Sequence, residues 1–299
     1  MLQFSQTTSL ERDMMSNVIV ITDSSAYLPP FQTDSLPVEV IPLYLTWEGN
    51  SYADGIDLQP EDFFRRLSRS SEMPRTSQIP LQTFLNVYHR WLEKGYDILS
   101  IHISSKVSGT VTAAIQAARE LATDKIRVFD SLTGAAAMAF QVVEAARAAA
   151  QGATLAECER IARKIRDASH TYFIPGTLEF LHRGGRIGGA AALLGSALKI
   201  HPILETRNGV IESCEKVRTM SRAMQRMVDL MEKRVGNCGR IMAASLYADL
   251  PELAETLLNL VKQRLGNRLH QTWFSTISPV IGAHIGPGAV GMAFTCHQD

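Results

Sequence analysis

The stretch Asp97–Leu121 reads DILSIHI, then SSKVSGT, then VTAAIQAAREL, and it decides the fold class. The first seven residues alternate apolar and polar side chains, which predicts a half-buried strand. In the last segment apolar residues recur at helical spacing. A turn of small polar residues therefore joins a strand to a helix, and this order is typical of α/β proteins.

The turn Ser104–Thr110 predicts a site for a negatively charged group. The N–H groups in the first turn of a helix have no carbonyl partner within it, and the helix dipole is positive at that end. Ser108 adds a hydroxyl donor, and Gly109 would let a ligand approach the backbone closely. A plainer interpretation is that Ser108 only caps its helix, and turn chemistry alone does not exclude it.

The composition is that of an ordinary soluble globular protein. Of the 299 residues 45% are apolar and 20% charged, and 30 basic residues cancel 30 acidic ones. Such a chain has no general attraction for nucleic acid or anionic membranes, so neither is an expected partner. The cysteines are Cys158, Cys214, Cys238 and Cys296. Their wide spacing argues against a zinc site or a disulfide framework and favours the reducing cytoplasm.

The chain is long enough for two domains. Residues 1–16 are polar and charged, which predicts a flexible leader rather than a signal peptide, and no apolar run approaches the length of a membrane span. Strands and helices alternate over residues 17–170, which predicts an α/β domain with a mainly parallel, Rossmann-like sheet. Residues 171–299 contain the hairpin signal Asn208-Gly209, so the second α/β domain should have a mixed or antiparallel sheet with helices.

Hydroxyl-rich segments follow three of the expected strands. Asp23-Ser24 follows the apolar run Val18–Ile21, Ser104–Thr110 follows the strand described above, and Asp130-Ser131 follows Ile126–Phe129. Because ligands bind at the carboxyl ends of strands in open α/β sheets, we expect these segments to converge at one edge. Ser24 is therefore also a candidate ligand contact.

Three other segments have simple structural interpretations. Val38–Thr46 predicts one apolar strand, and Asp54 and Asp57 fit a turn and a helix N-cap better than a metal pair. Met73–Pro80 predicts a stiff, extended loop between two prolines, which would present Thr76 and Ser77. The methionines of the helix expected over 219–235 are interpreted as core.

Familiar enzyme motifs give no support for catalysis. Gly286–Gly291 matches G-x-G-x-x-G, but a strand-like segment follows it instead of a helix, and only eight residues remain after Gly291. No P-loop lysine motif, H-E-x-x-H or G-x-S-x-G occurs in the sequence. We therefore assign no catalytic residue, no metal ligand and no cofactor.

A series of short motifs occurs in a characteristic order along the chain. In sequence order they are Thr22-Asp23-Ser24, Arg75-Thr76-Ser77-Gln78, Ser104–Thr110, Phe129-Asp130-Ser131, Leu181–Ile187, Leu198-Lys199-Ile200, Pro202-Ile203-Leu204 and His284-x-Gly-Pro-Gly. This order resembles the DegV family of fatty-acid-binding proteins from about Val18 to the C-terminus. The sequence departs from the family pattern at Ile79, which is inserted into Thr-Ser-Gln-Pro, and at His201, which replaces a usually basic residue.

The resemblance implies a fold, a ligand, a partner and a set of site residues. One long-chain fatty acid would lie between two α/β domains of a monomer, which would hand it to a dihydroxyacetone-kinase-like fatty acid kinase for phosphorylation of the carboxylate. Membrane contact would be transient at most. The implied residues contact the carboxylate, or for the two arginines the carboxylate or the kinase: Thr76, Ser77, Ser108, Gly109, His284, Arg183 and Arg186.

Two other functions remain open at this point. Ser108 with His284 could form the core of a hydrolase, although no third residue is identifiable that would orient the histidine. The same helix N-terminus could also serve a regulatory domain that binds a small molecule or phosphate.

Overall fold

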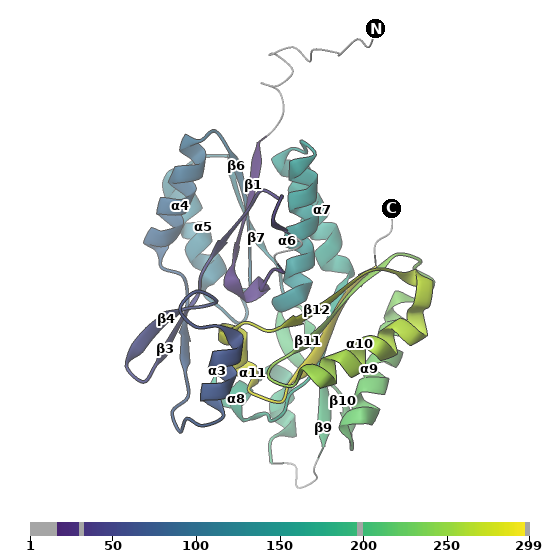
Figure 1. Ribbon diagram of the computed structural model, residues 1–299. Helices are drawn as coiled ribbons and strands as arrows, with labels where there is room; N and C mark the ends of the chain where they lie inside the picture. The colour runs from purple at the N-terminus through teal and green to yellow at the C-terminus, as the bar shows by residue number, and fades with distance from the viewer. Residues whose placement is uncertain (1–16, 30–32, 196–199, 297–299) are drawn as a thin grey trace.

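The computed structural model describes residues 17–29, 33–195 and 200–296, and its three sheets and their helices are arranged in layers (Figure 1). The first sheet is parallel throughout, with strand order β2-β1-β6-β7. Its strands are β1 (Val18–Asp23), β2 (Val38–Ile41), β6 (Asp97–His102) and β7 (Ile126–Asp130). Every residue of β1 is buried, as expected for a parallel strand with helices on both faces.

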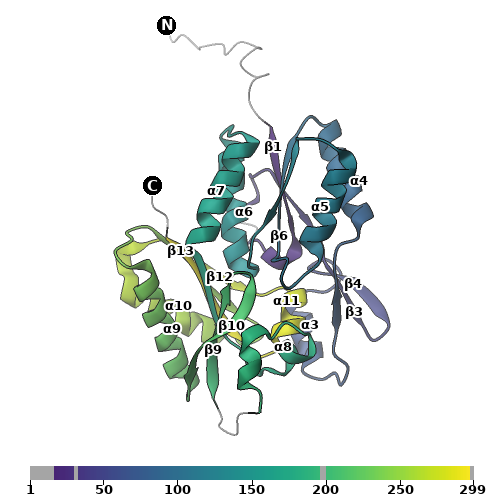
Figure 2. The same cartoon turned by 180° about the vertical axis from the view of Figure 1, so that it is seen from behind.

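Two helix pairs cover the two faces of the parallel sheet (Figure 2). α4 (Leu81–Glu93) and α5 (Thr110–Leu121) lie on one face, and α6 (Ala135–Ala150) and α7 (Leu155–Ala168) lie on the other. The sequence Thr154-x-x-Glu157 predicts a capping box, and it is confirmed at the start of α7, because Thr154 and Glu157 bond to each other's backbone N–H.

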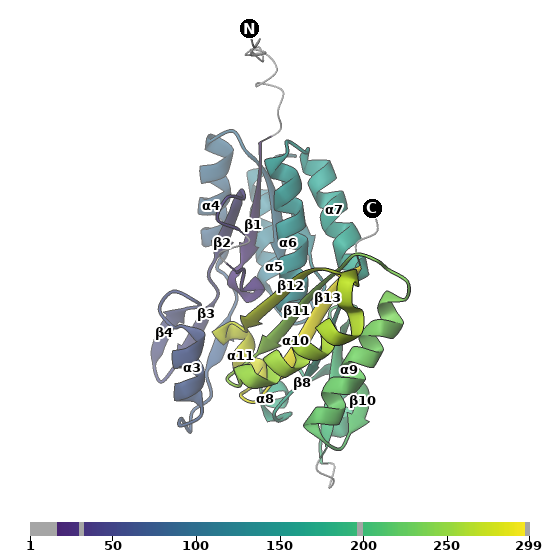
Figure 3. The same cartoon turned by 45° about the vertical axis from the view of Figure 1, so that its right-hand side comes forward.

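The second sheet is mixed and has the strand order β10-β9-β8-β13-β11-β12. Its strands are β8 (Ser169–Ile174), β9 (His201–Arg207), β10 (Val210–Val217), β11 (Ile241–Tyr247), β12 (Leu269–Thr276) and β13 (Val290–Cys296). α9 (Met220–Val235) and α10 (Pro251–Leu265) cover its outer face (Figure 3). The methionines of α9 at 224, 227 and 231 are buried there, which confirms their interpretation as core.

α6 and α7 lie between the two large sheets and contact both. One core cluster consequently runs from Val20 in β1 through Met138 in α6 to Ala244 and Trp273 in the mixed sheet. A second cluster fills the space between the mixed sheet and α9 and α10. Every described strand after residue 168 belongs to the mixed sheet. A boundary near residue 170 therefore separates the strands of the two large sheets in the sequence. Because these sheets share a core, the division of the chain into two domains stays a prediction.

A small antiparallel sheet, β4-β3-β5, lies beside the parallel sheet and corrects two predictions. The strand expected over Val38–Thr46 is interrupted at Pro42, so β2 joins the parallel sheet while β3 (Tyr44–Trp47) pairs with β4 (Asn50–Ala53). Pro42 has no N–H to donate to a ladder. The extended segment between the two prolines contains a strand, β5 (Arg75–Ser77), on the other edge of β3.

Three short helices flank the small sheet and the mixed sheet: α3 (Pro60–Leu67), α8 (Glu179–Arg183) and α11 (Pro279–Ile285). α3 begins at Pro60, since proline is favoured at the first position of a helix, and its N-cap is Gln59. The N-cap role expected from Asp54 and Asp57 is therefore wrong. α11 was not predicted from the sequence. The helix is hard to recognise in the sequence because Gly282 weakens the helical pattern over residues 279–285 and a second glycine, Gly286, follows directly.

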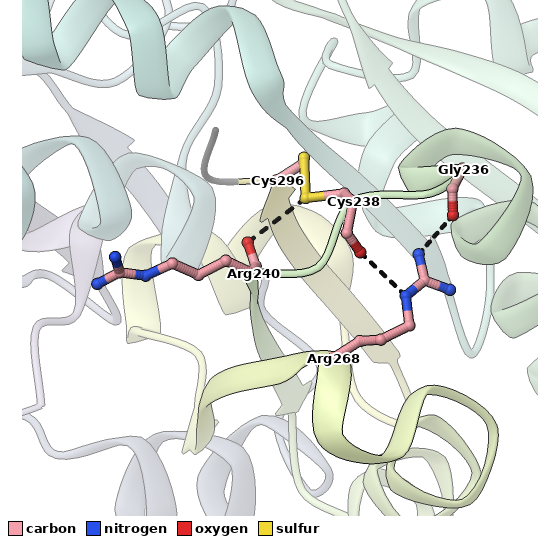
Figure 4. Close-up of a disulfide and its surroundings, with 5 residues drawn as sticks. All are labelled: Gly236, Cys238, Arg240, Arg268 and Cys296. Carbon is pink, nitrogen blue, oxygen red and sulfur yellow. Dashed lines mark hydrogen bonds between the residues drawn. A yellow bond between two sulfur atoms is a disulfide. The ribbon is translucent and has the colours of Figure 1, made fainter. Parts of the chain in front are cut away.

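The interpretation of the cysteines is corrected for one pair. Cys238, in the loop after α9, forms a disulfide with Cys296 at the end of β13, across a sequence separation of 58 residues (Figure 4). Arg268 holds the same loop by donating to the carbonyl oxygens of Gly236 and Cys238. Sequence spacing did not reveal the pair because β13 returns to lie beside β11, with Ile241 opposite Cys296.

Three further expectations concern absent or undescribed features. Residues 1–16 and Leu198-Lys199 lie outside the described residues. Across the described ranges, no helix combines the length and apolar character needed to cross a membrane. Over those same ranges, no cluster of three or more His, Cys, Asp or Glu residues is suited to hold a metal ion.

Candidate functional site

A cavity of about 360 Å³ lies where the parallel sheet, the mixed sheet and the small sheet meet; below we call it the central cavity. The inner face of the mixed sheet contributes Phe173, Thr206, Ile211 and Leu246, and α11 contributes Ile281 and His284 among others. Most of the lining side chains are apolar. Among the described residues, those that line it include no Asp or Glu, and Arg186 is their single Lys or Arg.

The predicted convergence of hydroxyl-rich strand ends is confirmed. Asp23 Oδ2 accepts a hydrogen bond from the Ile103 N–H at 3.0 Å, and Asp130 Oδ2 accepts one from the Ser105 hydroxyl at 2.5 Å. Both carboxylates thus hold the β6–α5 turn instead of facing the cavity. Ser104 fixes the far side of the turn, since its hydroxyl donates to the Gly209 carbonyl at 2.8 Å. The hairpin tip between β9 and β10 is thereby fixed to the parallel sheet.

Ser108 and Gly109 line the central cavity at the N-terminus of α5. Gly109 is the N-cap residue, so the interpretation of Ser108 as the N-cap is wrong by one position. Ser108 Oγ lies 2.9 Å from Thr110 Oγ1 and accepts a weak bond from the Thr110 N–H at 3.3 Å. The side-chain amide of Gln78 covers Gly109 closely, because a Cβ at residue 109 would lie 1.7 Å from Gln78 Oε1.

Thr76 and His284 meet across the cavity although 208 residues separate them. Thr76 Oγ1 lies 2.8 Å from His284 Nε2, with Thr76 on β5 and His284 near the C-terminal end of α11. His284 Nδ1 is buried and has no hydrogen-bond partner among the described residues. It lies against Gly184, where a Cβ would be 2.3 Å from Nδ1, so a larger residue at 184 would displace the ring.

Burial lowers the pKa of His284 to about 4, and the positive charge of Arg186 adds to the shift. The imidazole is therefore neutral near pH 7 and offers a hydrogen bond rather than a charge. The positive charge at this end of the cavity comes from Arg186. Its guanidinium donates to two backbone carbonyl oxygens, those of Val107 at 3.0 Å and Gly184 at 2.5 Å. It forms no ion pair with an acidic side chain among residues 17–29, 33–195 and 200–296, so its charge is available to an anion.

The structure divides the residues predicted from the sequence into two groups. Thr76, Ser77, Ser108, Gly109, His284 and Arg186 all line the central cavity. Ser24 and Arg183 do not: Ser24 is buried against Asp54, and Arg183 is exposed, with an ion pair to Glu179 at 2.7 Å and a contact to Met73 Sδ at 3.3 Å. Sequence reasoning missed Gln78 as a lining residue, although it stands beside Ser77 in the same motif.

The arrangement gives little support to a hydrolase. Ser108 is bonded to Thr110, while His284 is bonded to Thr76 and has no carboxylate on Nδ1 to orient it. A Ser–His–Asp series does occur elsewhere: Asp23 Oδ2 lies 3.0 Å from His102 Nδ1, and His102 Nε2 lies 2.7 Å from Ser100 Oγ. All three residues are fully buried, so no substrate reaches them. That series is part of the core.

Together these features define a layered α/β protein with a cavity between its sheets, apolar along most of its wall and suited to an anion at one end. The chain belongs to the DegV family: the model of that family, described as an uncharacterised protein family, matches residues 17–296. A DegV domain-containing protein of Clostridium perfringens is 35% identical over 282 residues, which are 93% of this chain and 98% of the relative.

Two solved structures are similar over almost the whole chain. One is described as fatty acid binding of a DegV family protein from Thermus thermophilus, with a TM-score of 0.89, 31% identity and coverage of 94% of this chain and 100% of that one. The other is DegV, a fatty acid binding protein from Bacillus subtilis, with a TM-score of 0.84, 31% identity and the same coverage. These similarities confirm the predicted family and fold class.

Proposed function

We propose that this protein binds one long-chain fatty acid in the central cavity, with the carboxylate between the N-terminus of α5, Thr76 and His284. The observation that supports this most is the composition of the lining, which combines many apolar side chains with a polar group around Thr76, Ser108 and His284. Within the described part of the chain, this group contains hydroxyls, a neutral histidine, one arginine and no acidic side chain, so it attracts a carboxylate without repelling it. The fatty acids named for the similar structures support the same ligand class.

Tail burial should supply most of the binding free energy. About 14 methylenes at ~0.8 kcal/mol each give a gross contribution of ~11 kcal/mol. Each head-group hydrogen bond adds only ~1 kcal/mol. The apolar wall should therefore determine affinity, while the polar end determines orientation. A phosphate-binding site would have no use for such a wall, so we do not favour that alternative.

The proposal extends to a partner and a setting. The bound acid would be presented to a separate fatty acid kinase that phosphorylates the carboxylate, so this chain would be a carrier and not itself an enzyme. It would act as a cytoplasmic monomer without metal or cofactor and touch membranes at most transiently. In that reducing compartment Cys238 and Cys296 would be thiols.

Native mass spectrometry of the purified protein tests the ligand directly. We expect one fatty acid per chain, and exchange with added acids whose affinity rises roughly 15-fold for each two carbons, from ~1.6 kcal/mol of extra burial. Protein that stays empty and takes up neither palmitate nor oleate would refute the proposal. Hydrolysis of p-nitrophenyl esters that is lost in both Ser108→Ala and His284→Ala would favour the hydrolase instead.

A further inference from the structure

Asp54 is a buried carboxylate that joins three segments of the chain lying far apart in the sequence. It follows β4 directly, and its exposed fraction is 2%. Its Oδ2 accepts a hydrogen bond from the Ser24 hydroxyl at 2.5 Å, and its Oδ1 accepts one from the Val280 N–H at 3.2 Å. Ser24 Oγ in turn accepts from the Leu43 N–H at 3.0 Å. Asp54 is thus held by Ser24, the residue after β1, and holds the first turn of α11.

α11 connects Asp54 to the polar end of the central cavity. Val280 and His284 are four residues apart, so they lie on the same side of the helix, one turn apart. The Val280 N–H is one of the first-turn donors that the helix itself leaves without a partner. A displacement of this N–H would therefore move the His284 ring, because a helix as short as Pro279–Ile285 moves as one piece.

Both ends of α11 are fixed to the same small sheet. Ala53, the residue before Asp54, pairs with Tyr44, and Thr76 pairs with the next residue, Leu45. Asp54 bonds the N-terminal end of α11 and Thr76 bonds His284 at its other end. The small sheet therefore positions His284 in two ways. Asp54, next to the edge strand β4, bonds the first turn of α11, and Thr76 in the edge strand β5 bonds His284 itself.

We propose that Asp54, anchored by Ser24, is the positioning residue that holds α11 so that His284 meets Thr76 at the head-group end of the central cavity. Its effect on ligand binding rests on the proposed function, but its effect on His284 does not. The neighbouring Asp57 has a different role. Asp57 is exposed, and its Oδ2 accepts from the Ala53 N–H at 2.8 Å, so it bonds the end of β4 and not the first turn of α11. Asp57 is therefore a matched control for Asp54, because it is an aspartate of the same turn.

NMR of the His284 imidazole tests the positioning role without any ligand. The His284 signals are assigned by their loss in His284→Gln. In Asp54→Ala we expect them to shift and the pKa of His284 to rise from about 4 towards its ordinary 6.5, as the ring loses its buried position. Asp54→Asn should restore most of the wild-type signal, because its amide oxygen can still accept from Val280. Asp57→Ala should leave the His284 signals unchanged.

Two results overturn the proposal. One is a folded Asp54→Ala protein whose His284 signals and pKa match the wild type, and the other is an equal change in Asp57→Ala. If Asp54→Ala does not fold, Ser24→Ala replaces it, and we expect a smaller shift in the same direction. An unchanged His284 in a folded Ser24→Ala protein would then overturn the proposal.

A double-mutant cycle on oleate affinity separates this inference from the proposed function. Asp54→Ala should weaken oleate binding about tenfold in the wild-type background and less than twofold in His284→Ala, because the two changes act through one contact. Equal weakening in both backgrounds overturns the positioning role. Absence of oleate binding in the wild type refutes the fatty-acid proposal, while the NMR result still decides on Asp54.

Discussion

His102 is fully buried and His284 is half-buried, and of the two only His102 has partners on both ring nitrogens among the described residues. His102 is fully buried, with Asp23 on Nδ1, Ser100 on Nε2 and the ring of Phe84 edge-on at 5.1 Å. His284 bonds Thr76 through Nε2, and its Nδ1 has no partner within the described residues. Satisfied polar groups specify a core, whereas a polar group left without a partner is costly and calls for an explanation. We explain the unpartnered Nδ1 of His284 by a bound ligand.

The largest expected effect is on stability at His102. His102→Ala should lower the free energy of unfolding by about 3–4 kcal/mol, because it leaves a cavity in the core and removes the partner of two buried groups. His284→Ala should cost less than about 1 kcal/mol, since only one bond is lost there. Chemical denaturation of both variants measures the difference. Equal losses would remove the distinction between the two histidines.

The next effect is on the pH dependence of stability. Burial raises the pKa of Asp54 to about 6 from 3.8 and lowers that of His284 to about 4 from 6.5. Between pH 4 and 6 native Asp54 keeps a proton that the unfolded chain has released, so its contribution to the free energy of unfolding falls as the pH rises. Native His284 lacks a proton that the unfolded chain binds, so its contribution rises between pH 4 and 6.5.

The two contributions to the free energy of unfolding therefore oppose each other in the wild type. Replacing one titrating group should reveal the pH dependence that the other causes. His284→Gln should lose up to ~3 kcal/mol more than the wild type as the pH rises from about 4 to 6. Asp54→Asn should change in the opposite direction. Urea unfolding at several pH values measures both curves. Parallel curves for all three proteins would show that neither group titrates as its burial implies.

A smaller effect is expected on ligand affinity at His284. His284→Ala should weaken oleate binding about tenfold, which corresponds to ~1.4 kcal/mol, because one head-group contact is lost while tail burial is kept. Displacement of a fluorescent fatty acid measures the change. Unchanged affinity would show that the unpartnered Nδ1 has no connection with the ligand.

The smallest effect should be at Arg183, whose partners are already within the protein. Arg183→Ala should change oleate affinity less than twofold, because the guanidinium is paired with Glu179 outside the cavity. Arg186→Ala, the matched control, should weaken binding more, since Arg186 lines the cavity.

We expect Arg183→Ala to keep its fatty acid yet support acyl-phosphate formation poorly with a competent kinase. Lipid content and acyl-phosphate formation are measured on the same preparation. Loss of lipid from this variant would place Arg183 in the binding site.

Local signals in the sequence predicted most of the helices and strands. The capping box at Thr154, Pro60 at the start of α3 and the Asn208-Gly209 hairpin all act within a few residues, so the sequence pattern contains them fully. The separation of β2 from β3 shows the limit of such local prediction. The four-residue strand β2 ends before Pro42, and an apolar run does not indicate which of two sheets each of its parts joins.

The predicted residues line the central cavity where they follow a strand end or begin a helix, as Ser108 does. A predicted residue lies away from the cavity where a distant segment binds its side chain. Ser24 follows a strand end as expected, but Asp54, 30 residues later, takes its hydroxyl. The contact between Asp54 and Val280 spans 226 residues, and no local pattern in the sequence reveals it.

The bond between Cys238 and Cys296 closes a covalent ring that contains β11, α10, β12, α11 and β13. His284 and the lining residues from Leu246 to Gly291 lie inside this ring. Under oxidising conditions a single protease cut between the two cysteines would therefore leave both fragments linked, and the wall of the cavity would stay attached to the molecule. Under reducing conditions the same cut would leave the C-terminal fragment attached only by its packing and its strand pairing to β8 and β11.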